Sequence, residues 1–262
     1  MSDTKTVKAP LTPKTDKKPH VVKLKVFWKH TRHWTEADVQ AFQAEAPSIA
    51  ARLQKTRYIR GDGSIKGERL TCEDFAIMVL AEFASAQGLP VALTTGVRRY
   101  RNVEVYNPGE HDKYASNKFG FAEMAMLSYG APDMQRAGIN TLKVPTIGQL
   151  RPGDILAQAG DRVNNTAHHI QMAVNVSASK LVIKQGNTGG MLFRPMTTIK
   201  RWLGKNMADP QNDGYGGLPI EDGVYTKNGE TWDYRNETTG NSKKDALKIF
   251  EFYRWNFMGF NK

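Results

Sequence analysis

The sequence contains one cysteine, Cys72, among 262 residues, so no internal disulfide can form. A lone cysteine is most often a small buried hydrophobe, and only its surroundings can argue for chemistry. The sequence also lacks any run of about 18 apolar residues, which excludes a membrane-spanning helix. Residues 1–20 include no apolar stretch such as a signal peptide needs, so we expect synthesis in the cytoplasm without such a leader.

Acidic residues are outnumbered, with 26 Asp and Glu against 37 Lys and Arg, and the net charge is +11. Nine of the basic residues fall in residues 1–33, beside only Asp3 and Asp16. Such an arm can contact an anionic surface or a delivery partner, or it can simply keep the protein soluble. No nucleic-acid-binding motif follows it, so we expect no nucleic-acid partner. Residues 1–20 are predicted to be disordered because they hold little to bury.

Beyond this arm, hydrophobic patterning predicts an α+β fold. Helices are expected over residues 36–45 and 48–55, separated by Pro47, then over 72–87, around 120–127 and from about residue 243. Strands are expected over residues 22–28, 154–157, 169–176 and 181–185, with a hairpin over 224–234 about Asn228-Gly229. The helix over 72–87 is apolar nearly all round, so we expect it at the centre of the core.

Cys72 begins that central helix. Thr71 and Asp74 have the spacing of a capping box, with Thr71 as the cap. The thiol therefore sits at the positive end of the helix dipole, which favours the thiolate that a cysteine nucleophile needs. Glu73 and Asp74 oppose this effect, so the nucleophile also requires a cationic partner.

His168 and His169 are the candidates for that partner. Strand alternation puts Ile170, Met172 and Val174 on one face together with His168. We therefore expect His169 to face a polar cleft as the base, and His168 to face packing or the strand's edge. The alternative is a pair of surface or metal-binding histidines. The remaining histidines show no metal-ligand spacing, so neither a metal nor a cofactor is predicted.

A catalytic base needs a neighbour that fixes its tautomer. Gln185 and Asn187 share one side of the strand that ends at Gln185-Gly186-Asn187, and either amide could accept the imidazole N–H. Gln185 is the preferred candidate and Asn187 the second. Asn187 could equally be a turn residue that closes a hairpin with Gly186.

These segments together resemble a known superfamily. The stretch from Tyr58 through the glycines at 61, 63 and 67 to Cys72, with the helix ending at Gly88-Leu89-Pro90, resembles the nucleophile segment of the NlpC-like cell-wall cysteine hydrolases. Pro152-Gly153-Asp154 resembles the turn before their first barrel strand, and residues 169–174 resemble their histidine strand. Residues 182–187, at the end of the strand that follows the histidine strand, are closer to the same segment of the related CHAP amidases.

The resemblance implies a papain-like domain over residues 21–190, in which the nucleophile helix packs on an antiparallel sheet or half-barrel. An insertion of about residues 91–144 interrupts it, and residues 191–262 form an extension expected to pack on the catalytic domain. Two departures concern the site. Glu73-Asp74 replaces the small residues usual after the cysteine and looks more like the transglutaminase-type branch. Gln185 stands where CHAP enzymes have an acid.

The implied reaction is acyl transfer, in which Cys72 attacks an amide carbonyl and His169 takes and later returns a proton. The oxyanion would rest on the backbone N–H of Cys72 and on a second donor, with Tyr58 the candidate, and with Thr71 and His168 beside the substrate. The implied substrate is peptidoglycan, cut at peptide or N-acyl bonds. With the basic arm, this suggests an antibacterial type VI secretion effector exported to the target-cell periplasm, with a secretion apparatus or an immunity protein as partner.

Two alternatives stay open. One is a toxin of the same fold that deamidates or crosslinks a host protein, which Glu73-Asp74 favours. The other is a non-enzymatic binding module whose surface is formed by terminal aromatic residues, namely Tyr225, Trp232, Tyr234 and Trp255. Aromatic side chains like these more often belong to the core.

Overall fold

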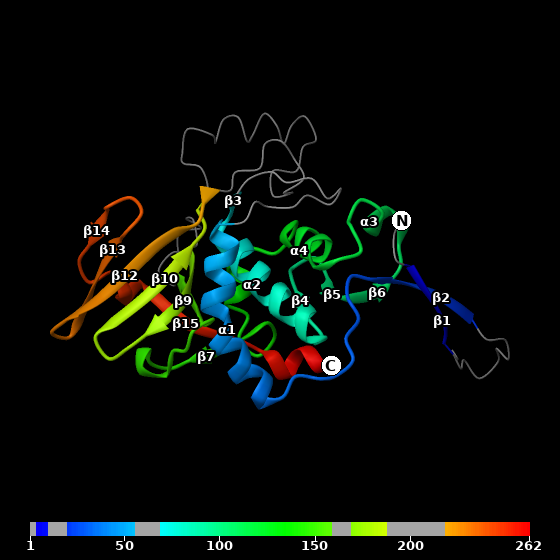
Figure 1. The fold of residues 1–262 in the computed structure, drawn as a ribbon, viewed down its shortest axis with the longest axis horizontal. Coiled ribbons are helices and arrows are strands. Elements are labelled where there is room, and N and C mark those ends of the chain that lie inside the picture. Colours follow the sequence, from blue (N-terminus) through cyan, green and yellow to red (C-terminus); the bar gives the residue numbers. More distant parts are fainter. Residues whose placement is uncertain (1–3, 10–19, 56–68, 159–168, 188–217) are drawn as a thin grey trace.

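The protein is described by a computed structural model over residues 4–9, 20–55, 69–158, 169–187 and 218–262 (Figure 1). Its helices are α1 (Glu36–Lys55), α2 (Cys72–Gln87), α3 (Pro108–His111), α4 (Lys118–Met126) and α5 (Ala131–Met134), with 3₁₀ turns at Ile147–Gln149, Ala246–Ile249 and Phe257–Asn261. Its strands up to residue 144 are β1 (Thr4–Ala9), β2 (His20–Val26), β3 (Arg69–Leu70), β4 (Ala92–Thr94), β5 (Arg99–Arg101), β6 (Val103–Val105) and β7 (Thr141–Val144). The later strands are β8 (Ile155–Gln158), β9 (Ile170–Val176), β10 (Lys180–Gln185), β11 (Leu218–Pro219), β12 (Glu221–Asn228), β13 (Thr231–Asn236), β14 (Ser242–Lys243) and β15 (Phe250–Trp255).

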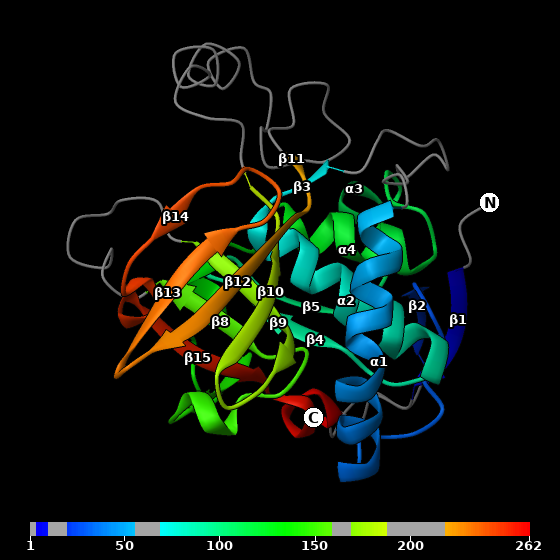
Figure 2. The same ribbon diagram turned by 60° about the vertical axis from the view of Figure 1, so that its left-hand side comes forward.

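One large antiparallel sheet organises the fold, which is α+β as the patterning predicts. Its eight strands run in the order β14-β13-β12-β10-β9-β8-β15-β7. Figure 2 shows β13, β12 and β10 side by side within it. β12 lies beside β10, and β15 lies between β8 and β7. Residues 191–262 were expected to form an extension packed on the catalytic domain. Their described part, residues 218–262, contributes β12, β13, β14 and β15 to the same sheet as β7, β8, β9 and β10.

Each face of the large sheet covers its own hydrophobic core. On the face toward α1 and α2, the residues Ile155, Ile170 and Met172 join the larger core. On the opposite face, Leu156 and Ala173 join a smaller core with side chains from β10, β12 and β13. The alternation predicted for residues 169–174 is thus present, and both of its faces are buried.

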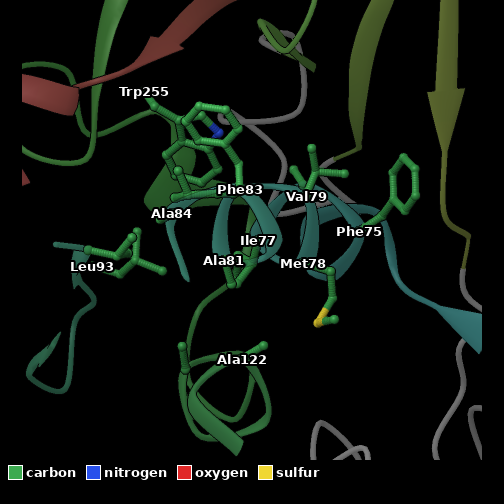
Figure 3. Close-up of a cluster of buried hydrophobic side chains, with 14 of the residues drawn as sticks. Phe75, Ile77, Met78, Val79, Ala81, Phe83, Ala84, Leu93, Ala122 and Trp255 are labelled. Atoms are coloured by element: carbon green, nitrogen blue, oxygen red, sulfur yellow. The ribbon is translucent and has the colours of Figure 1, made fainter. Parts of the chain in front are cut away.

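Helix α2 is the central element of the larger core, and its predicted bounds are confirmed. Its side chains pack on several sides, with Phe83 near Trp255 and Ala81 toward Ala122 of α4 (Figure 3). The helix ends at Gly88, whose φ of 63° is the left-handed conformation that glycine adopts without a steric cost. No helix in the described ranges is long and apolar enough to cross a membrane.

Pro47 does not break the first helix, contrary to expectation. α1 runs through it from Glu36 to Lys55. Buried residues before and after the proline, Phe42, Ala46 and Ile49, keep helical spacing on one face. Because this face packs on α2, burial outweighs the cost of about 3 kcal/mol that an interior proline imposes.

Two other local predictions differ from the structure, and in both places the chain forms β-strands. Part of the arm that was expected to be disordered, Thr4–Ala9, pairs antiparallel with β2 as the edge of a small sheet with β6. The helix expected from about residue 243 is replaced by β14, a 3₁₀ turn and β15. In β15, Tyr253 and Trp255 enter the larger core while Phe250 and Phe252 pack on the smaller one, and only a strand can serve both faces in this way.

Candidate active site

The start of α2 is fixed by its cap. The carboxylate of Asp74 accepts the backbone N–H of Thr71 at 3.2 Å and also the Thr71 hydroxyl. This is the predicted capping box. The hydroxyl of Thr71 thus takes part in holding the start of α2.

Cys72 as a residue is 9% exposed, and its thiol lies between two neighbours. Its Sγ donates to Oε2 of Glu73 at 2.8 Å and accepts the backbone N–H of Ile170. Burial raises the pKa of the thiol well above its ordinary value, the nearby Glu73 carboxylate adds to this, and the Ile170 N–H acts in the opposite direction. The thiol is therefore protonated at neutral pH, and burial outweighs the helix-dipole effect expected from the sequence.

The imidazole of His169 is held by Gln185. The distance from Nε2 of His169 to Oε1 of Gln185 is 2.8 Å, and Nε2 of Gln171 donates to the same oxygen at 2.8 Å. Burial lowers the pKa of His169, while the Gln185 hydrogen bond and the charge of Glu221 raise it. The net effect keeps the imidazole neutral near pH 7.

The thiol of Cys72 contacts the backbone directly after His169. The N–H that Cys72 accepts belongs to Ile170, the residue that follows His169. Among the described residues, however, no hydrogen bond joins the thiol to the imidazole, because the thiol proton is directed at Glu73.

Asn187 does not contact the imidazole but extends the same polar network. Its Nδ2 donates to Oε2 of Glu221 at 2.7 Å, and Asn236 donates to that oxygen at 2.7 Å. Gln185 donates to it as well, at 2.9 Å. Sequence reasoning missed Glu221. Only the pairing of the strands places the start of β12 beside the end of β10, and the sequence alone does not reveal that pairing.

The other predicted site residues, Tyr58 and His168, lie outside the described residues. Within the described ranges, no group of three or more His, Cys, Asp or Glu side chains is arranged to hold a metal ion. Of the aromatic residues considered for a binding surface, Tyr225, Trp232 and Trp255 are buried in the two cores. Tyr234 packs beside Tyr225 with its hydroxyl 3.2 Å from Nε2 of Gln185, so the packing interpretation fits these side chains better.

Comparison with known proteins adds no assignment: no protein-family model, no curated protein and no solved structure matches this chain.

Proposed function

We propose that this protein is a papain-like cysteine hydrolase that cleaves amide bonds, with Cys72 as nucleophile and His169 as base. One observation carries the proposal. A lone thiol at the start of a buried helix accepts the N–H next to His169, and the imidazole is itself oriented by an amide. Covalent acyl transfer requires a nucleophile within reach of a base that a third group orients, and these two contacts support such an arrangement.

The reaction follows from the direction of these hydrogen bonds. Gln185 Oε1 accepts from Nε2 of His169, which leaves Nδ1 as the basic nitrogen. When the thiol turns from Glu73, its proton passes to Nδ1 as sulfur attacks the amide carbon, and the C–N bond breaks as that proton goes to the leaving amine. Water, deprotonated by Nδ1, then attacks the thioester carbon, the C–S bond breaks, and Nδ1 returns the proton to the sulfur of Cys72. The first-turn N–H of Cys72 is suited to the oxyanion because first-turn donors lack helical partners.

The proposed substrate is peptidoglycan, cut at a peptide or N-acyl bond by a toxin delivered to a target cell. This part of the proposal is supported by the family resemblance of the segments around Cys72, Asp154 and His169, and by the net charge of +11, which suits an anionic wall.

The test is mass spectrometry of purified muropeptides incubated with the wild type, Cys72→Ala and His169→Ala. We expect new fragments with the wild type alone, and the fragment masses would name the bond. His33→Ala, which changes an exposed histidine, is the matched control and should retain cleavage. Cleavage that persists in Cys72→Ala would refute the assignment of the nucleophile.

A second candidate is a deamidase or transglutaminase-like enzyme acting on a protein side chain. It is favoured by Glu73, which directly follows Cys72 and touches its thiol. Intact muropeptides in every sample, together with Cys72-dependent ammonia release from glutamine-containing proteins, would support this candidate.

A further inference from the structure

Glu221 lies at the centre of a polar network that begins at the imidazole. The pairing of β10 with β12 puts Gln185 opposite Glu221. A single oxygen of Glu221, Oε2, accepts from Gln185, Asn187 and Asn236 at 2.9, 2.7 and 2.7 Å. Gln185 is the last residue of β10, Asn187 lies two residues after it, and Asn236 is the last residue of β13. The Glu221 carboxylate therefore connects β12 to β10, to the segment after β10 and to β13.

The network has a fixed direction because a carboxylate can only accept hydrogen bonds. Gln185 must therefore turn its NH₂ group to Glu221 and its Oε1 away from it. That oxygen then faces Nε2 of His169 and Nε2 of Gln171, both at 2.8 Å. Gln171 is held in the matching orientation because its Oε1 accepts the hydroxyl of Tyr225 at 2.8 Å.

From this geometry we infer that Glu221 is a positioning residue of the proposed active site, which acts through Gln185 to hold His169 as the Nε2–H tautomer with Nδ1 unprotonated. The inference rests on the proposed function for its catalytic meaning, but the tautomer itself is a property of the folded protein. It also assigns a part in the site to β12, a strand beyond residue 190.

Glu221 is the carboxylate of this network, and the tyrosine and cysteine groups that the described residues place around it are neutral. Burial, with Glu221 nearby, raises the pKa of Tyr234 to about 12, and burial raises the pKa of Tyr225 as well. From α2, the Cys72 thiol is protonated and shares its proton with Glu73. The charge of Glu221 acts to raise the pKa of His169, so its removal should lower that pKa further.

Asp222 provides a matched control. It is the next residue on β12 and faces the other side of the sheet, where it pairs with Lys184 and accepts from Nε2 of Gln54 at 2.9 Å. Asp222→Asn and Glu221→Gln therefore remove the same charge from the same strand, but only the second change touches the network of His169.

The experiment is a pH titration of histidine-labelled protein by long-range ¹H–¹⁵N spectroscopy, which reports tautomer and pKa without any substrate. In the wild type we expect the neutral His169 signal as the Nε2–H form. In Glu221→Gln, the Gln185 amide can reverse, so we expect a mixture of tautomers and a lower pKa of His169. Asp222→Asn should match the wild type. An unchanged His169 spectrum in Glu221→Gln would overturn the inference.

Activity on muropeptides is the second measurement. We expect Glu221→Gln to lower kcat/KM by about 100-fold, a typical contribution of a well-placed base, with little change for Asp222→Asn. If no variant or wild type cleaves muropeptides, the proposed function fails while the spectra still decide the role of Glu221. If Glu221→Gln does not fold, Glu221→Asp, which is one methylene too short to reach all three amides, should give a smaller change in the same direction.

Discussion

A Cβ atom at Gly186 would lie 2.3 Å from the backbone oxygen of Thr71 and 2.5 Å from that of Leu70. The end of β10 is therefore pressed against the chain that leads into Cys72. This contact brings the segment carrying Gln185 to the start of α2, and it requires a residue without a side chain. The glycine between the two amides thus serves packing rather than a hairpin turn.

Gly186→Ala should accordingly lower the free energy of unfolding by about 1–3 kcal/mol, the usual cost of overpacking a close contact. Urea unfolding followed by circular dichroism measures the loss. Gly148→Ala is the control, because the nearest atom to its added Cβ is 4.0 Å away. Equal stabilities of the two variants would show that β10 and the residues before Cys72 are not in close contact.

Glu73→Gln should make the thiol easier to ionise. The Glu73 carboxylate raises the pKa of Cys72 both by its charge and by accepting the thiol proton, so removing its charge should lower that pKa. The pH dependence of the iodoacetamide reaction reports this directly because Cys72 is the only cysteine. Each unit of change gives a tenfold change in thiolate below the pKa.

Glu82→Gln, which alters a carboxylate paired with Arg52 and Lys118 farther along the same helix, should leave the reaction profile of the thiol as in the wild type. A Glu73→Gln profile identical to that of the wild type would contradict the hydrogen bond between Glu73 and the thiol.

His169 should make the fold sensitive to acid. Burial lowers its pKa in the folded state, so the unfolded chain binds a proton more readily. The stability that depends on neutral His169 is complete above its ordinary pKa of about 6.5 and is lost as the pH falls through the lowered folded pKa. Melting temperatures measured from pH 7.5 to 5 should therefore fall less steeply for His169→Asn than for the wild type. Burial also lowers the pKa of His30. Because His30 is present in both proteins, its contribution cancels in the comparison of their melting temperatures. Parallel curves would count against burial of the imidazole.

Arg254 should be essential for stability because it pairs with a buried carboxylate. Its guanidinium donates to both oxygens of Asp154, at 2.8 and 2.7 Å, and the Asp154 side chain is 2% exposed. Arg254→Met would leave that charge without its partner, at a cost of about 3–5 kcal/mol in unfolding free energy. The double variant Arg254→Met with Asp154→Asn should be more stable than Arg254→Met alone. If it is less stable, the unpaired charge is not the source of the loss.

Local patterns in the sequence predicted the parts of this fold that local interactions decide. The bounds of α2 followed from the cap at Thr71 and the glycine at 88, and the hairpin about Asn228-Gly229 followed from its turn residues. The contact of His169 with Gln185 followed from strand alternation in two neighbouring strands. In each case, residues close in sequence carried the information.

The rest depended on contacts between distant residues. Nothing local indicates that β12 pairs with β10 or that β15 enters between β8 and β7, so Glu221 could not be placed at the site from the sequence. Pro47 and the last strand were predicted wrongly because burial against distant elements outweighed local propensity. The Cys72 thiol donates to Glu73, the next residue in the chain. That contact depends on the rotamers of both side chains, which the sequence does not specify.

The position of β15 has a consequence for biosynthesis. A strand from residues 250–255 fills the space between β8 and β7, so a ribosome-bound chain cannot complete this sheet until residue 255 has left the ribosome. Until then β8 exposes an unpaired edge, which makes the emerging polypeptide a natural client for chaperones.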